Sequence, residues 1–119
     1  MAKYVDGFVV PIKKANLAAY KKMAKVGRKV WMEHGALEYV ECVGDDIEGA
    51  LAPSFKQMCK LKANETAIFA YVVYKSKADR NRVNKLVMQD PRMQPGPKTK
   101  MPFDMKRFAM GGFKAIVTS

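Results

Sequence analysis

The two halves of this 119-residue chain repeat one order of predicted elements: strand, helix, strand. Each half opens on an apolar stretch of strand length, continues through a longer amphipathic stretch and closes on a second apolar stretch. The predicted strands are residues 4–10, 37–43, 67–74 and 108–117. This βαββαβ order predicts an α+β sandwich, a single domain over residues 1–119 with both helices on one face of one sheet. The other face of the sheet is then left uncovered.

Start and stop signals bound the two predicted helices. Apolar residues recur every three or four positions over residues 14–34, while lysines fill the other face. Gly35 follows directly and suits the left-handed backbone that ends many helices. The second helix is expected to begin at Ser76, an N-cap residue with Asp79 in the first turn, and to end before Pro91.

Composition indicates a globular protein with one core. Apolar content of 49% and charged content of 28% are ordinary globular values. The longest apolar run, residues 67–74, is far shorter than the ~20 residues that cross a bilayer, and no signal-peptide pattern is present at the start. Cys42 and Cys59 form neither a disulfide framework nor a CxxC pair, so we expect a cytoplasmic protein. Cys42, within a predicted strand, is expected to be a small buried residue.

The net charge of +11 is unevenly distributed. Residues 1–50 carry eight Lys/Arg against seven Asp/Glu, a net charge of +1, whereas residues 51–119 carry fourteen against four, a net charge of +10. Such an excess can attract nucleic acid, anionic lipid or an acidic ligand. It can equally be a solubilising surface, so charge alone leaves the partner open.

Sequence motifs for familiar chemistry are missing. The chain has no GxSxG, no GxGxxG after its first strand and no P-loop, so we expect no cofactor, and whether it is an enzyme stays open. His34 is the single histidine and a candidate for proton transfer, although a histidine at a helix C-terminus also suits a capping role. No second His or Cys stands at ligand spacing from it, so we expect no metal site.

One motif points to RNA. Residues 69–74 fit the last six positions of the RRM octamer, if Tyr is allowed for Phe, and lie on the third predicted strand, where that motif belongs. Phe69 and Tyr71 would share a sheet face and could stack bases. Alternating aromatic residues are also simply good strand formers. In this nucleic-acid interpretation, phosphates would meet the basic residues Arg80, Arg82, Lys85, Lys98, Lys100 and Arg107.

Several blocks, in order and over nearly the full length, resemble a known family. They are YVDGFVVP at residues 4–11, HGALEYVEC at 34–42, DPRM at 90–93, and MPFDMKR at 101–107 followed by GGF at 111–113. Together they are similar to the YbaA-like family of small uncharacterised bacterial proteins. The resemblance implies a ferredoxin-like subunit that pairs sheet to sheet into a dimeric α/β barrel. It implies no reaction and no catalytic residue.

Related barrel superfamilies include cofactor-independent monooxygenases and heme-degrading enzymes, which bind small molecules between sheet and helices. A monooxygenase-like enzyme is therefore an alternative by fold analogy alone. The main expectation is a homodimer, because two helices can cover only one of the two apolar sheet faces. Each subunit would bind a small molecule in a cleft between sheet and helices.

Four residues near the predicted strand ends are the candidates for that cleft: His34, Tyr39, Asp104 and Arg107. They combine ionisable groups with an aromatic ring. Asp104 and Arg107 could instead form an ion pair at the entry to the last strand. The segment 94–100, with its Pro-Gly-Pro core, is expected to be a mobile loop, either a lid over the cleft or a linker without a role.

Overall fold

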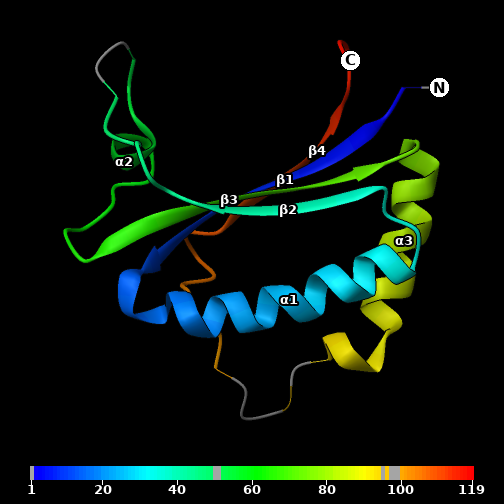
Figure 1. Ribbon diagram of the computed structural model, residues 1–119, viewed down its shortest axis with the longest axis horizontal. Helices are drawn as coiled ribbons and strands as arrows, with labels where there is room; N and C mark the ends of the chain where they lie inside the picture. The colour runs from blue at the N-terminus through cyan, green and yellow to red at the C-terminus, as the bar shows by residue number, and fades with distance from the viewer. Residues whose placement is uncertain (1, 50–51, 95, 97–99) are drawn as a thin grey trace.

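The computed structural model describes residues 2–49, 52–94, 96 and 100–119 (Figure 1). Its elements follow the predicted order, and the spacing of Phe55, Met58 and Leu61 also predicts the short helix between the second and third strands. They are β1 (Tyr4–Lys13), the 3₁₀ turn η1 (Lys14–Asn16), α1 (Leu17–Glu33), β2 (Glu38–Val43), α2 (Phe55–Met58), β3 (Glu65–Tyr74), α3 (Lys77–Gln89), the 3₁₀ turn η2 (Pro91–Met93) and β4 (Ala109–Lys114).

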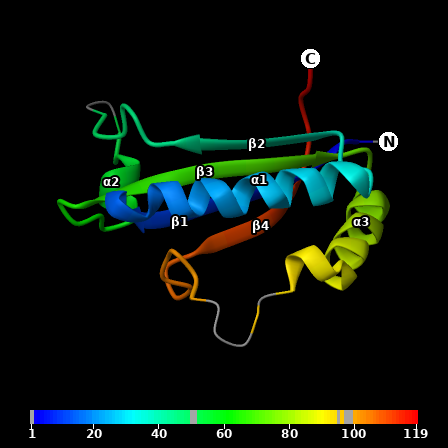
Figure 2. The same cartoon turned by 60° about the horizontal axis from the view of Figure 1, so that its bottom comes forward.

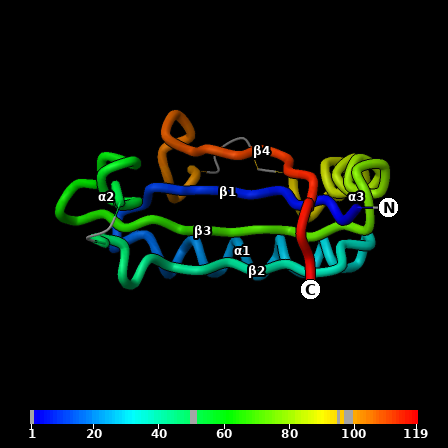
Figure 3. Tube along the Cα trace, turned by 90° about the horizontal axis from the view of Figure 1, so that it is seen from above, coloured from blue at the N-terminus to red at the C-terminus, as the bar shows by residue number. Residues whose placement is uncertain are grey.

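The four strands form one antiparallel sheet in the order β2-β3-β1-β4 (Figure 3). The central strands β1 and β3 pair along their whole length, from Tyr4 opposite Tyr74 to Lys13 opposite Glu65. A βαββαβ chain with this strand order has the ferredoxin-like arrangement. The α+β prediction is therefore confirmed.

Two strand ends differ from the prediction by three residues, and three strand starts differ by one or two. Strand β1 runs on through Pro11 to Lys13, and its pairing with β4 stops at Val9, so one side of the strand is an edge where proline is tolerated. Strand β4 ends at Lys114, three residues earlier than expected, because its partner β1 begins at Tyr4, directly opposite. Val117, predicted to lie in the strand, is exposed.

The helix boundaries lie close to their predicted positions. The Ser76 hydroxyl accepts a hydrogen bond from the Asp79 amide at 3.1 Å and so caps α3. Gly35 has a φ of +118°, the left-handed backbone expected after α1. Among the described residues, no helix combines the length and apolar character that crossing a membrane requires.

The core lies between the sheet and α1. Alternate residues of the two central strands point to this side and are buried, among them Val10, Ile12, Ile68 and Val72. Helix α1 runs along the sheet, whereas α3 stands at one end of it (Figures 1 and 2). The chain after η2 then returns to the sheet, and residues 101–108 lie on its helix side and lead into β4 (Figures 1 and 2).

The opposite face of the sheet is largely uncovered. The side chains of Val9, Phe69 and Phe113 lie on it, and α2 covers one end, where the Phe55 ring lies 6.3 Å from that of Phe69. Cys42 is also on this face and is exposed, so its predicted burial was wrong. The cause is its place on the edge strand β2, on the side away from the helices.

Candidate functional site

A cavity of about 190 Å³ lies between α1, the helix-facing side of the sheet and residues 101–108. Its walls are mostly apolar, and three parts of the chain supply them. Helix α1 contributes Tyr20, Met23, Ala24, Gly27 and Trp31; the sheet contributes Phe8, Tyr39, Glu41, Ala70 and Val72; the chain after α3 contributes Met93, Met101, Phe103 and Phe108.

Aromatic rings pack against one another around this cavity. The ring centroids of Phe103 and Phe108 are 5.7 Å apart, and the Phe8 ring stacks on Phe108 at 6.0 Å. On the other side, the Trp31 and Tyr39 rings are 5.9 Å apart. These contacts hold the walls in place and give the cavity several ring faces.

The polar centre of the cavity is Glu41, whose two carboxylate oxygens each accept a hydrogen bond from a tyrosine hydroxyl. Tyr39 donates to Oε2 at 2.6 Å, and Tyr20 donates to Oε1. Burial, and then the hydrogen bond to Glu41, raise the pKa of both tyrosines well above the ordinary value of 10.0. Both hydroxyls therefore stay protonated and hold the carboxylate in one orientation.

Local sequence places this trio. Tyr39 and Glu41 alternate along β2, so both side chains point to the helix-facing side, opposite Val72 and Ala70 respectively. Gly27 makes room for the Tyr39 hydroxyl, because a Cβ there would lie 3.0 Å from that oxygen. A small residue on this turn of α1 thus lets a large aromatic residue of β2 reach under the helix.

The four residues proposed from the sequence are not gathered in one place. Tyr39 lines the cavity, but His34 caps α1 and hydrogen bonds Asp90 at 2.9 Å. Asp104 accepts a hydrogen bond from the Lys106 amide at 2.9 Å. In the described part of the chain, no side-chain hydrogen bond or ion pair joins any two of the four.

The ion pair considered between Asp104 and Arg107 does not form. Arg107 instead pairs with Glu65 at 2.6 Å and donates to the Cys59 carbonyl at 3.0 Å. The guanidinium lowers the pKa of the Glu65 carboxyl from its ordinary value, mainly through this hydrogen bond. Arg107 therefore ties the chain before β4 to the start of β3.

Sequence reasoning missed Tyr20, Trp31 and Glu41. A usable signal was present for Glu41: it stands two residues from Tyr39 in a predicted strand, so it had to share a sheet face with that ring. A carboxylate on the helix-facing side of a sheet is unusual and needs a partner. Tyr20 carried no such signal, since only the path of α1 over β2 brings the two together.

Beside the cavity, a buried polar network joins the sheet to α3. Asp6 is 1% exposed and accepts from Arg80 Nε at 3.0 and 3.1 Å and from Asn84 at 3.2 Å. Tyr74 donates to Asn84 at 3.0 Å, and the Trp31 indole N–H reaches both of these groups. Trp31 thus belongs to the network through its nitrogen and to the cavity wall through its ring.

A glycine opposite Asp6 leaves space for this network. Gly112 of β4 pairs with Asp6, and a Cβ at Gly112 would lie 2.5 Å from the Tyr4 hydroxyl oxygen and 2.9 Å from Arg80 Nη2. The Arg80 guanidinium also sits over the Tyr4 ring, 5.2 Å from its centroid. The YVDG and GGF blocks therefore meet in space around Arg80.

A second polar cluster joins the HGALEYVEC and DPRM blocks at the surface. Asp90 accepts from His34 and, at 2.7 Å, from Arg92, which also pairs with Glu33 at 2.8 Å. The Arg92 guanidinium, and then His34, lower the pKa of Asp90 well below its ordinary value. This cluster fixes the C-terminal end of α1 to the turn after α3.

The residues of the nucleic-acid interpretation are spread over two layers. Phe69 and Tyr71 lie on the uncovered sheet face, with ring centroids 6.3 Å apart. Arg80, Arg82 and Lys85 are on α3, at the end of the helix layer, where Arg80 is held by Asp6 and Arg82 pairs with Asp79 at 2.8 Å. Lys100 is exposed, and Lys98 lies outside the described residues.

The structure describes the segment 94–100 only in part, because residues 95 and 97–99 lie outside the described residues. The lid and linker interpretations of this segment therefore stay predictions.

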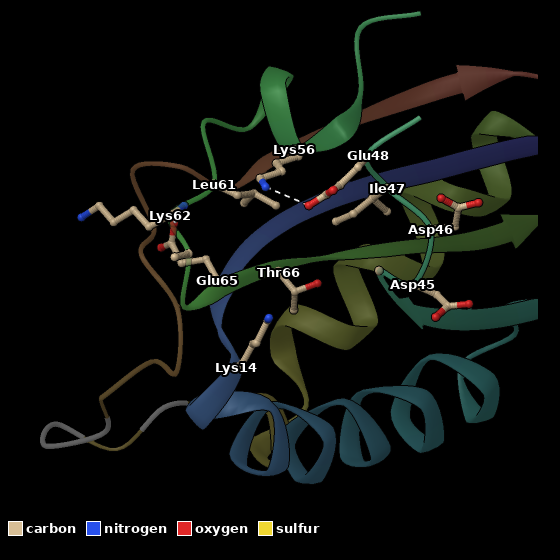
Figure 4. A pocket seen from close by; sticks show the side chains of 12 residues that line it. Lys14, Asp45, Asp46, Ile47, Glu48, Lys56, Leu61, Lys62, Glu65 and Thr66 are labelled. Carbon is tan, nitrogen blue, oxygen red and sulfur yellow. Dashed lines mark hydrogen bonds and ion pairs between the residues drawn. The ribbon is translucent and has the colours of Figure 1, made fainter. Parts of the chain in front are cut away.

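A larger but polar pocket of about 290 Å³ lies at the far end of the sheet, beside α2 (Figure 4). Its charges are of both signs, and Lys56 already pairs with Glu48 at 2.8 Å. In the described residues, no three His, Cys, Asp or Glu side chains are grouped to hold a metal ion.

The comparisons with known proteins place the chain in a family. Residues 3–105 match the family model described as a protein of unknown function, DUF1428. The chain is 39% identical over 115 residues to the uncharacterised protein YbaA of Escherichia coli K12, covering 97% of each, and equally similar to YbaA of Shigella flexneri. A crystal structure titled a dimeric ferredoxin-like protein, from an uncultured marine organism, shares the fold, with a TM-score of 0.60, 10% identity and full coverage of both chains. The chain therefore belongs to the DUF1428 family and is a relative of the YbaA proteins.

Proposed function

We propose that this protein binds a small, largely apolar molecule in the cavity between α1 and the sheet. The observation that carries the proposal is a cavity lined by aromatic and methionine side chains around one carboxylate, Glu41, which two tyrosine hydroxyls hold in place. Apolar walls with a few convergent polar groups are typical of small-molecule sites.

The size of the cavity supports this function over a packing defect. A dry cavity of about 150 Å³ is large enough to hold benzene, and this one measures about 190 Å³. Voids of such size cost stability, on the order of 24 cal/mol per Å³ when enclosed. A ligand with a single ring would fill the space and recover those contacts.

We propose further that the binding unit is a cytoplasmic homodimer that packs through the uncovered sheet faces. Apolar side chains stand out on that face: Phe69 is 46% exposed and Phe113 is 63% exposed. The related structure titled a dimeric ferredoxin-like protein supports a second copy as the occupant. Two free cysteines suit a reducing compartment.

Trp31, the single tryptophan, gives a direct assay, because its ring lies in the cavity wall. We expect at least one of toluene, benzyl alcohol, benzylamine and benzoate to change its fluorescence at millimolar concentration. Ala24→Leu fills the cavity from α1 and should lower that affinity about tenfold or more. Ala19→Leu makes the same change at an exposed site of α1 and should leave it unchanged. Failure of all four compounds to bind the wild type would overturn the proposed function.

The dimer has its own test. We expect light scattering to give twice the monomer mass of 13.4 kDa at micromolar concentration. Phe113→Lys, on the uncovered face, should convert the protein to a monomer, whereas Met88→Lys on α3 should not. The two side chains are matched in exposure, at 63% and 60%. A wild type that stays monomeric would refute the dimer.

A further inference from the structure

We infer that the cavity binds a small monoamine, a primary ammonium ion attached to one apolar ring or short chain. The inference rests on the ligand-binding function proposed above and specifies the chemical class of its ligand. Its first support is charge. The chain carries 22 Lys and Arg residues, yet among the described residues that line the cavity the one formal charge is the carboxylate of Glu41.

The hydrogen bonds of Glu41 leave room for a ligand. A carboxylate offers about four lone-pair sites over its two oxygens, and the Tyr20 and Tyr39 hydroxyls use one on each oxygen. Both tyrosines are neutral donors, so they orient the carboxylate without neutralising its charge. An ammonium group would supply the positive charge that balances the carboxylate. It would also form a charge-assisted hydrogen bond, which is stronger than the hydrogen bond of a neutral hydroxyl.

The walls favour a cation for a second reason. Tyr20, Trp31, Tyr39 and Phe103 line the cavity, and the face of an aromatic ring attracts ammonium ions, tryptophan most strongly. The ring centroids of Trp31 and Tyr39 are 5.9 Å apart, and those of Tyr20 and Phe103 are also 5.9 Å apart. An ammonium ion bound to Glu41 would therefore lie in a cavity lined by these rings.

The residues that line the cavity also limit which other groups the ligand can carry. No second acidic group lines the described cavity, so a diamine would leave one ammonium unpaired. Among the described residues no lysine, arginine or histidine lines it either, so an amino acid would leave its carboxylate buried without a partner, which is unfavourable. The volume of about 190 Å³ suits one six-membered ring with one or two further heavy atoms.

Four compounds of nearly equal shape test this class: benzylamine, benzyl alcohol, toluene and benzoate, each titrated against the full-length protein at pH 7 by Trp31 fluorescence. We expect benzylamine to bind about tenfold or more tightly than benzyl alcohol, since a charged donor replaces a neutral one. Benzoate should not bind. Glu41→Gln should remove the advantage of benzylamine. Glu48→Gln makes the same charge change at an exposed side chain, 72% accessible, and should keep that advantage.

The outcomes separate the two claims. If toluene or benzyl alcohol binds as tightly as benzylamine, the amine class is wrong while ligand binding in the cavity stands. If none of the four compounds binds, ligand binding in the cavity fails as well. If Glu41→Gln keeps the full preference for benzylamine, the assignment to Glu41 is overturned. The ranking of the four compounds by the wild type is decisive even if the variant does not fold.

Discussion

Replacing Arg80 by methionine should destabilise the fold by about 3 to 5 kcal/mol, the usual cost of removing one partner of a buried ion pair. Asp6 is 1% exposed, and Arg80 meets its carboxylate through Nε at 3.0 and 3.1 Å and through Nη2 at 3.0 Å. Without Arg80, the carboxylate keeps the single hydrogen bond from Asn84, at 3.2 Å. An uncompensated charge then stays buried in the sheet.

Arg82 provides a matched control on the same helix. Its ion pair with Asp79 measures 2.8 Å, but its side chain is 52% exposed, and surface pairs contribute about 0 to 1 kcal/mol. Arg82→Met should therefore lower the free energy of unfolding far less than Arg80→Met does. The double variant Asp6→Asn with Arg80→Met should cost less than Arg80→Met alone, because it removes the unpaired charge.

Urea and thermal unfolding at one protein concentration measure these differences. At roughly 4 °C per kcal/mol for a chain of this size, Arg80→Met should lower Tm by about 12 to 20 °C. The reasoning is refuted if Arg80→Met and Arg82→Met lower the free energy of unfolding by the same amount. It is also refuted if the double variant is no more stable than Arg80→Met, since the cost would then not come from the charge left on Asp6.

Two further predictions concern the same polar clusters. Gly112→Ala should lower the free energy of unfolding by about 1 to 3 kcal/mol, because the new methyl group overpacks against Tyr4 and Arg80. Gly49→Ala places a methyl group with nothing within 4 Å and should leave that free energy, measured by urea unfolding, nearly unchanged. Asp90→Asn should lower Tm near neutral pH. Because the folded protein lowers the pKa of Asp90 from 3.8, that stabilisation is present above this value and lost as pH falls through the folded pKa. The gap between variant and wild type should thus narrow below about pH 4, and a gap that is constant with pH would contradict this.

The fold was predictable because its signals are local. The Ser76 hydroxyl accepts from the Asp79 amide three residues away, and Gly35 directly follows the C-cap residue of α1. Nearby residues therefore determine where α3 begins and where α1 ends. Alternation along each strand likewise marks one face as buried. The predictions that failed depend on neighbouring strands: β4 ends where its partner β1 begins, and Cys42 is exposed because β2 is an edge strand.

The candidate site was only partly predictable, because its contacts join distant parts of the chain. Tyr20 and Glu41 are 21 residues apart, and they meet only through the packing of α1 on β2. His34 was chosen as the single histidine, yet Asp90, 56 residues later, holds it in a surface cluster away from the cavity. Reasoning from residue type identifies reactive groups, but it does not say which partner each group will find.

The buried polar network around Asp6 and the cavity form one mechanical unit. Trp31 links them: its indole N–H is hydrogen bonded to Tyr74 and Asn84, 3.1 and 3.2 Å away, and its ring is a wall of the cavity. Asn84 in turn donates to Asp6, which Arg80 neutralises. The buried ion pair therefore fixes the position of an aromatic wall as well as the joint between sheet and α3. A cavity whose walls are set by buried hydrogen bonds keeps its shape without a ligand, and a preformed shape reduces the entropy lost on binding.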